Sequence, residues 1–154
     1  MNNKILEHFL QATNEVFQMM FDIEFDFSTP MEAKSLHYDE GHICAEIALL
    51  GDIKGTITFK FNADTALDLV EIMCGMEIDE VDEFVKSALG EIANIISGNA
   101  LTTLSQEEII GDLEPPLIIT QSKKYEENDN VHITVVDATS DIGTMNFVFV
   151  EKDQ

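Results

Sequence analysis

Hydrophobic residues recur along this chain with two different periods. Residues 4–21 carry them at spacings of three and four, which predicts an amphipathic helix with Ile5, Phe9, Ala12, Val16 and Met20 on one side. Beyond Pro30 the spacing changes to two. The beginning of the chain is therefore expected to be helical, and the part that follows is expected to form a sheet.

The period of two predicts six strands in two groups of three. The first group covers residues 31–38, 42–50 and 53–61, and the last of these places Ile53, Gly55, Ile57, Phe59 and Phe61 on one face. The second group covers residues 116–121, 131–138 and 145–150. Residues 123–130 are charged, and we interpret them as a hairpin loop.

Two further helices lie between these groups. Asn62 or Asp64 can cap a helix over residues 64–74 that Gly75 ends. The acidic residues Asp79 and Glu80 suit the start of a long helix over residues 80–105, because negative charge is favourable at a helix N-terminus.

The order of these elements predicts an α+β fold with an internal repeat. A helix and three strands are followed by a helix, and then by a long helix and three strands. We expect residues 1–154 to form a single domain of two such units related by a pseudo-twofold axis, with helices packed on a largely antiparallel sheet.

The long helix contains the strongest candidate for chemistry, the segment Glu91-Ile-Ala-Asn94-Ile-Ile-Ser-Gly98. Glu91 and Asn94 lie about 60° apart on a helical wheel, and Gly98 lies almost above Glu91. Ser87 and Thr102 extend this polar stripe. The opposite face is apolar and is expected to enter the core, with Val85, Leu89, Ile92, Ala93, Ile96 and Ala100.

This stripe has two interpretations. It can be a solvated face of a buried helix, or it can be a surface that docks on another molecule. Ile95 and Leu101 bracket the polar pair with apolar groups, and glycine at Gly90 and Gly98 lets another body approach. The docking interpretation makes Ser87, Ile95, Gly98 and Leu101 partner contacts. The first half offers Gln11-x-x-Asn14-x-x-x-Gln18 at the corresponding place, which predicts one site per chain.

Composition excludes several classes of function. The chain has 154 residues, of which 45% are hydrophobic, and a formal net charge of -22. Nucleic acid and anionic membranes would repel such a charge. No apolar run approaches the roughly 18 residues of a membrane span, and the start of the sequence lacks a secretory pattern. We expect a cytoplasmic protein in which Cys44 and Cys74 are reduced thiols.

Other common chemical motifs are missing from the sequence. It has no glycine loop of the Walker type, no paired cysteine motif, no Gly-x-Ser-x-Gly elbow and no two histidines spaced for a metal. His37 and His42 are expected to be surface imidazoles, and His8 and His132 have no obvious acidic companions. The acidic residues of 79–83 are expected to stabilise the start of the long helix.

The segment Glu91-x-x-Asn94-x-x-x-Gly98 in a long helix, followed by Glu114-Pro115-Pro116-Leu-Ile-Ile, resembles the CheC/CheX group of chemotaxis phosphatases. The CheX-like members, with one intact motif, are the closer match. The resemblance implies dephosphorylation of a phosphorylated CheY-like response regulator. Glu91 would pair with a lysine of the regulator, and Asn94 would orient the attacking water. It also implies a homodimer formed through sheet edges. The protein would have no cofactor of its own, because the regulator would supply the Mg²⁺.

Three functions remain open at this point. The first is a phosphatase acting on a response regulator. The second is a non-catalytic module that binds a regulator or motor protein, as flagellar switch domains of this fold do. The third is a small-ligand domain that uses a cleft between helix and sheet. Glu91 and Asn94 side chains that project outward would favour the first.

Overall fold

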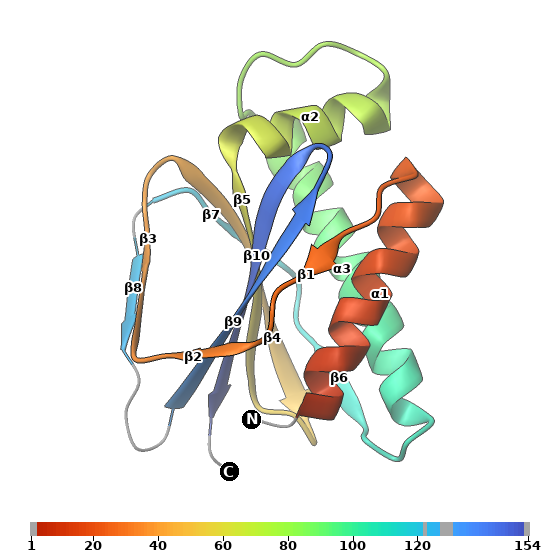
Figure 1. Ribbon diagram of the computed structural model, residues 1–154, viewed down its shortest axis with the longest axis vertical. Coiled ribbons are helices and arrows are strands. Elements are labelled where there is room, and N and C mark those ends of the chain that lie inside the picture. Colours follow the sequence, from red (N-terminus) through yellow and green to blue (C-terminus); the bar gives the residue numbers. More distant parts are fainter. Residues whose placement is uncertain (1–2, 122, 127–130, 153–154) are drawn as a thin grey trace.

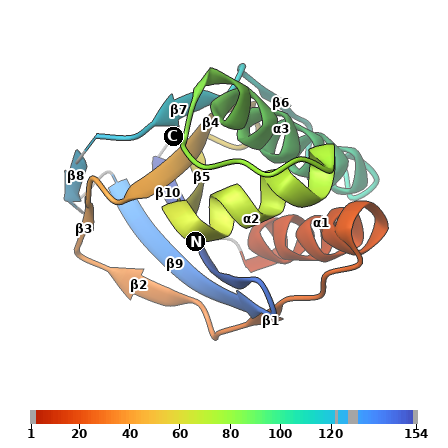
Figure 2. The same cartoon turned by 90° about the horizontal axis from the view of Figure 1, so that it is seen from above.

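The computed structural model describes residues 3–121, 123–126 and 131–152. Three helices, α1 (Asn3–Phe21), α2 (Ala63–Cys74) and α3 (Glu83–Ser105), pack on one face of a curled antiparallel sheet. Figures 1 and 2 show all three helices on the same side of the long strands. The structure thus confirms the predicted α+β fold.

The strands form one large sheet and one small sheet, and every pairing between them is antiparallel. The eight-stranded sheet has the order β1-β9-β10-β5-β4-β6, with β2 beside β9 and β7 beside β4, and the small sheet pairs β3 with β8. The strand bounds are β1 (Asp26–Phe27), β2 (Met31–Ala33), β3 (Ser35–Tyr38), β4 (His42–Gly51), β5 (Gly55–Asn62), β6 (Gly111–Leu113), β7 (Leu117–Ile119), β8 (Lys123–Glu126), β9 (Val131–Ser140) and β10 (Gly143–Lys152).

The pairing pattern is symmetric about the central pair of β5 and β10. β4 pairs with β5, β6 and β7, and β9 pairs in the same way with β10, β1 and β2. Each half of the chain therefore contributes a helix followed by five strands, two more than the sequence indicated. This symmetry supports the internal repeat, and the description of residues 1–154 as one domain stays a prediction.

Two strand predictions were wrong in detail. Residues 31–38 do not form one strand, because the chain breaks between β2 and β3, which belong to different sheets. Residues 123–126 are not part of a loop, because they form β8 and pair with β3 from Ser35 to Tyr38. The rest of the expected loop, residues 127–130, lies outside the described residues. Figure 2 shows β3 and β8 set apart from the large sheet.

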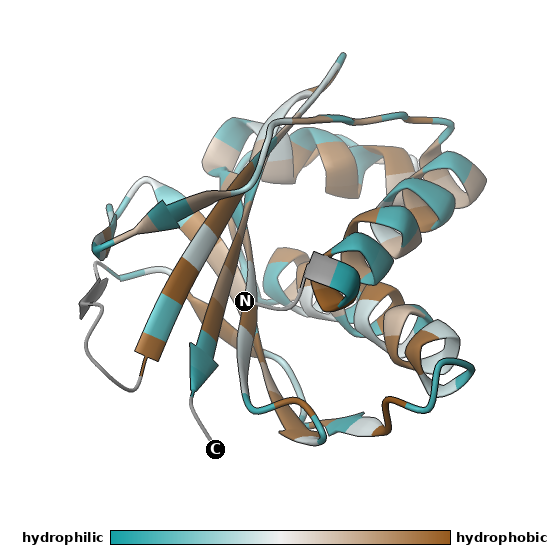
Figure 3. Cartoon of the chain, turned by 60° about the horizontal axis from the view of Figure 1, so that its bottom comes forward, coloured by the Kyte–Doolittle hydropathy of each residue, from teal (hydrophilic) through white to brown (hydrophobic). Residues whose placement is uncertain are grey.

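The main core fills the space between the sheet and the helices. Phe59 and Phe147 face each other across β5 and β10, with ring centroids 5.3 Å apart in an edge-to-face arrangement. Hydrophobic residues alternate with polar ones along the strands, as Figure 3 shows. Gly55 starts β5 with φ +154°, and an added Cβ there would lie 2.0 Å from the carbonyl oxygen of Val150. Only glycine fits at this point.

A second, smaller core lies on the other face of the sheet. This core consists of Tyr38, which comes from the small sheet, and of Cys44, Ile133, Val148 and Val150 from the large sheet. Cys44 is buried, Cys74 is half-buried, and both are free thiols, as expected. Within the described ranges, none of the helices has the length and apolar character that crossing a membrane requires.

Candidate functional site on helix α3

Contacts at both ends fix the position of α3. At its start, Asp82 Oδ1 accepts a hydrogen bond of 3.0 Å from the backbone N–H of Val85. The predicted start at residue 80 was therefore slightly early, because Asp82 is the capping residue. At its end, a polar cluster joins the last turns of α3 to α1.

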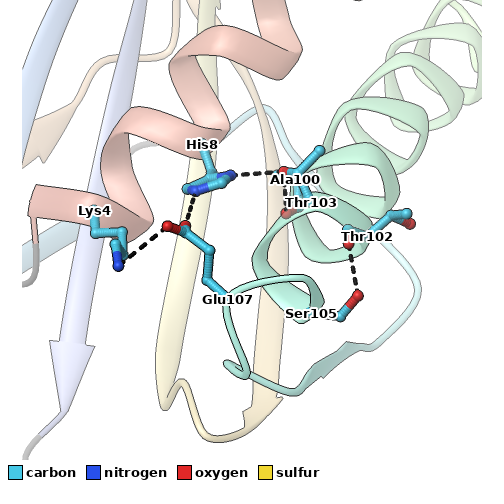
Figure 4. Close-up of polar contacts among 7 residues, drawn as sticks. All are labelled: Lys4, His8, Ala100, Thr102, Thr103, Ser105 and Glu107. Atoms are coloured by element: carbon cyan, nitrogen blue, oxygen red, sulfur yellow. Dashed lines mark hydrogen bonds and ion pairs between the residues drawn. The ribbon is translucent and has the colours of Figure 1, made fainter.

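This cluster centres on His8 of α1 and is drawn in Figure 4. His8 Nδ1 and Thr103 Oγ1 share a hydrogen bond of 2.7 Å, and His8 Nε2 contacts the carboxylate of Glu107. Lys4 Nζ lies 3.1 Å from the same carboxylate. The hydrogen bonds from Lys4 and then His8 lower the pKa of Glu107. His8 thus has an acidic companion after all, which sequence spacing could not reveal.

The polar stripe of α3 faces outward as the helical wheel predicts. Glu91 and Ser87 are exposed, and Asn94 is half-buried. The face assigned to the core is at most 1% exposed at every position, namely Val85, Leu89, Ile92, Ala93, Ile96 and Ala100. The helix is therefore held by its apolar side. The polar stripe of Ser87, Glu91, Asn94 and Thr102, which we call the crest, is left to the solvent.

Glu91 and Asn94 have no partner on this crest. Neither side chain makes a hydrogen bond or an ion pair with any residue that the structure describes. The carboxylate and the carboxamide can therefore hydrogen-bond to water, and they are free to bind groups of another molecule. The third open function needed a site on the core side of the helix, and the outward position of this pair does not favour it.

The two glycines of α3 have different roles. An added Cβ at Gly90 would lie 3.3 Å from Pro116 Cγ and 3.5 Å from Ile118 Cδ1, so the chain's own segment before and within β7 fills that space. At Gly98, in contrast, the described part of the chain has no heavy atom within 4 Å of the Cβ position, apart from the adjacent residues and the helix's own nearby backbone. The open approach to the helix that the sequence suggested therefore exists at Gly98, next to Asn94.

A groove runs beside the crest between α3 and β7. It has a volume of about 470 Å³ and includes Glu91 in its wall. One positive charge, Lys86, lies in the groove, and its Nζ is 3.3 Å from Glu83 Oε1. The lining residues are Glu83, Lys86, Ser87, Gly90, Glu91, Pro116 and Ile118. Neither the groove nor the place of Lys86 in it could be predicted from the sequence, because β7 approaches α3 from far along the chain.

The expected apolar bracket around the polar pair is only partly present. Leu101 is 9% exposed and belongs to the main core, because β6 covers this side of α3 and brings Gly111 next to the Leu101 side chain. Its assignment as a surface contact was wrong. Ile95 is half-buried against the same core. Ser87, Ile95 and Gly98 stay predicted partner contacts.

The corresponding positions on α1 are used differently. The Asn14 side chain accepts a hydrogen bond of 2.9 Å from the backbone N–H of Phe25 and donates one of 3.4 Å to its carbonyl oxygen. Gln11 donates to the neighbouring Glu15 at 3.2 Å. The amide of Asn14 thus holds the segment after α1 in place, which agrees with the expectation of one site per chain.

Acidic residues are numerous, but they do not gather into a metal site in the described part of the chain. No group of three or more His, Cys, Asp or Glu side chains is arranged there to hold a metal ion.

Comparisons with known proteins find a curated relative and similar solved structures. A curated relative, the CheY-P phosphatase CheX of Thermotoga maritima, is 26% identical over 121 residues, which cover 78% of this chain and 77% of the relative. The crystal structure of chemotaxis protein CheX from Desulfovibrio desulfuricans has a TM-score of 0.81 at 23% identity, covering 96% of this chain and 99% of that one.

A third similar structure is the CheX-CheY-BeF3-Mg²⁺ complex from Borrelia burgdorferi. It has a TM-score of 0.75 at 25% identity and covers 97% of each chain. The model of the family "Chemotaxis phosphatase CheX" matches residues 43–139, a stretch that contains both Glu91 and Asn94. Because this match spans more than half of the sequence, the chain belongs to the CheX family of chemotaxis phosphatases.

Proposed function

We propose that this protein hydrolyses the aspartyl phosphate of a CheY-type response regulator, and that Asn94 and Glu91 enter the regulator's active site to do so. The observation that carries the proposal is the unpartnered carboxylate and amide on the outward crest of α3, beside open space at Gly98. Membership of the CheX family and the name of the Thermotoga relative support the same reaction.

Asn94 acts by positioning a water molecule. Its carbonyl oxygen accepts a hydrogen bond from the water, and its N–H group can donate to a phosphoryl oxygen. The water oxygen attacks phosphorus opposite the aspartyl oxygen, the bond between that oxygen and phosphorus breaks, and the products are a free aspartate and inorganic phosphate. Phosphoryl transfer needs alignment and charge stabilisation more than covalent help, so an amide is sufficient.

Glu91 acts by docking. A carboxylate beside a phosphoryl group is unfavourable unless a cation receives it, so Glu91 must meet a positive group of the regulator, which we assign to its active-site lysine. The regulator would bring its own Mg²⁺, which would supply positive charge at the phosphoryl group. Glu91 would thereby fix the register of α3 on the regulator, and Asn94, one turn further along, would face the phosphoryl group.

The partner binds transiently in this account. With a net charge of -22, the protein gains no general attraction toward an acidic phosphorylation site, so local pairing has to supply the affinity. We also propose a homodimer formed through sheet edges, which the resemblance to CheX-like proteins implies, and a cytoplasmic location. Sedimentation of the purified protein tests the dimer directly.

The decisive experiment measures the lifetime of the phosphorylated regulator. CheY-type regulators of the source organism are charged with acetyl phosphate, separated from it, and followed with and without this protein. The proposal expects at least one regulator to lose phosphate many times faster when the protein is present. Binding without any acceleration would instead establish the non-catalytic module.

A further inference from the structure

Two large apolar side chains are exposed at the connection between α2 and α3. Met76 is 62% exposed and Phe84 is 52% exposed. They lie in the wall of a hollow of about 620 Å³, together with the half-buried Ile78 and several carboxylates. Figure 1 shows this connection arching over the end of the molecule. Exposed methionine and aromatic residues in a concave site are typical of protein interfaces.

Phe84 lies on the same crest of α3 as Glu91. The two residues are seven positions apart, so they differ by about 20° around the helix axis and by about 10 Å along it. Ser87 is exposed between them. The apolar patch formed by Met76 and Phe84 is therefore continuous with the proposed catalytic crest. A molecule seated on Glu91 and Asn94 would extend toward Phe84.

The connection is held in one conformation. The N–H of Gly75, in the left-handed region at φ +69°, donates to the carbonyl oxygen of Glu71 at 2.8 Å. The N–H of Ile78 donates to Glu71 Oε1 at 2.9 Å. Ile78 and Val81 pack against the main core. Met76 and Phe84 are thus presented on an anchored segment, which lowers the entropy cost of binding.

The charge around the patch restricts its occupant. Residues 77–83 contain Glu77, Asp79, Glu80, Asp82 and Glu83 and no basic residue. A second copy of this chain seated symmetrically on the patch would bring these carboxylates together, because a twofold contact uses the same surface on both sides. A partner with an apolar surface rimmed by lysine or arginine is complementary to it.

We propose that Met76 and Phe84 form a second docking point for the response regulator, which receives an apolar patch of the regulator framed by basic side chains. This inference rests on the proposed function, because the regulator is the molecule seated on Glu91. It assigns partner selection to the α2–α3 connection, separately from the catalytic pair. Regulators that lack such a basic-rimmed patch would be poor substrates even with an intact phosphorylation site.

Phe84→Ala tests the apolar contact. Loss of an aromatic anchor weakens binding by about tenfold, so KM for the phosphorylated regulator rises by that factor while kcat is unchanged. Phe84→Leu retains part of the side chain and is expected to recover part of the affinity. Leu50→Ala is the matched control, because it also removes an exposed large apolar side chain. Leu50 is 45% exposed and lies on β4, after the buried Leu49. Melting temperatures confirm that each variant is folded.

The triple variant Glu77→Gln, Asp79→Asn, Glu80→Gln tests the charge. It leaves Asp82 in place, because Asp82 caps α3. Removal of the carboxylates should slow association with the regulator several-fold at low ionic strength and have little effect at high salt, where charges are screened. Association is followed by stopped flow with the same regulators.

The dissociation constant of the regulator, measured alongside turnover, separates this inference from the proposed function. If the wild type binds but does not hydrolyse, the catalytic proposal fails, and weaker binding by Phe84→Ala still supports the docking point. If the wild type hydrolyses and Phe84→Ala keeps its KM, the docking point is wrong. If the wild type self-associates and Phe84→Ala is monomeric, the patch belongs to a copy of this chain, and the inference is overturned. If the regulator does not bind the wild type at all, both proposals fall.

Discussion

Asn14 and Asn94 lie at the same distance from the starts of α1 and α3, yet their side chains are in opposite states. Asn14 is bonded to both the N–H and the carbonyl oxygen of Phe25, and Asn94 is bonded to nothing in the described chain. One asparagine is part of the fold, and the other is available to a partner. This contrast provides a pair of matched substitutions.

Asn14→Ala should destabilise the protein without reducing its activity. The substitution leaves the backbone groups of the buried Phe25 without their side-chain partner, which costs about 1–3 kcal/mol. Urea unfolding measures this loss, and turnover of a phosphorylated regulator at a temperature where the variant is folded should match the wild type. A variant as stable as the wild type, or one that is folded but inactive, would contradict this division of roles.

Glu91→Gln should weaken docking more than it slows chemistry. Loss of one partner of a charge pair at an interface costs about 2 kcal/mol, or roughly thirtyfold in affinity, because the other charge is left unpaired. KM for the phosphorylated regulator is therefore expected to rise and kcat to change little. Glu7→Gln removes an exposed glutamate on α1 and serves as the control. A fall in kcat with unchanged KM would assign Glu91 to the chemical step instead.

Gly98→Ala should make the protein more stable. Alanine in a helix interior is favoured over glycine by up to about 1 kcal/mol. Beyond the helix's own nearby backbone and the adjacent residues, the added methyl group meets no heavy atom of the described residues within 4 Å. Gly98→Leu should also fold, but its side chain would occupy the space beside Asn94 and raise KM for the regulator. Thermal unfolding and steady-state kinetics of both variants test this opposition between stability and docking.

Gly90 provides the internal control for Gly98. Its Cβ position lies 3.3 Å from Pro116 Cγ, so Gly90→Ala must push the segment before β7 away from α3. The helix-propensity gain should be offset, and the variant should be no more stable than the wild type. Equal stabilisation at both glycines would show that the packing of Pro116 against α3 is loose.

The contact of Glu107 with Lys4 and His8 predicts a specific response to acid. Because the folded-state pKa of Glu107 lies below its unfolded value, its contribution to stability is complete above the ordinary glutamate pKa of about 4.3. That contribution is lost as the pH falls through the lowered pKa. Glu107→Gln should therefore reduce stability near pH 7 and lose less stability between pH 5 and pH 3 than the wild type. Urea unfolding measures the free energy of unfolding of both proteins at each pH. If the two free energies changed with pH in parallel, this contribution of Glu107 would be ruled out.

The long elements could be predicted from the sequence because each buries one regular face. The apolar stripes of α1 and α3 and the alternation in β4, β5, β9 and β10 extend over many residues. Strands of two or three residues, such as β1 and β6, are too short to show a period. The charge of β8 indicated a loop, but β8 lies in a separate small sheet where pairing with β3 determines its structure.

The site could be predicted only as far as one helix determines it. Angles around α3 correctly placed Glu91 outside and Leu89 inside, because the helix repeat fixes them. The same angles could not show that β6 covers Leu101 or that Pro116 fills the space at Gly90, since both depend on segments that return from later in the chain. The bonding of Asn14 to Phe25 and the contact of His8 with Glu107 are likewise tertiary.

The rate of regulator dephosphorylation by Asn94→Ala tests the central claim most directly. The amide has no partner in the described chain, so the variant should unfold at the wild-type temperature and still bind the phosphorylated regulator. Loss of a group that positions reactants in the transition state should lower kcat by about a hundredfold or more. A folded Asn94→Ala protein that dephosphorylates the regulator at the wild-type rate would contradict the account.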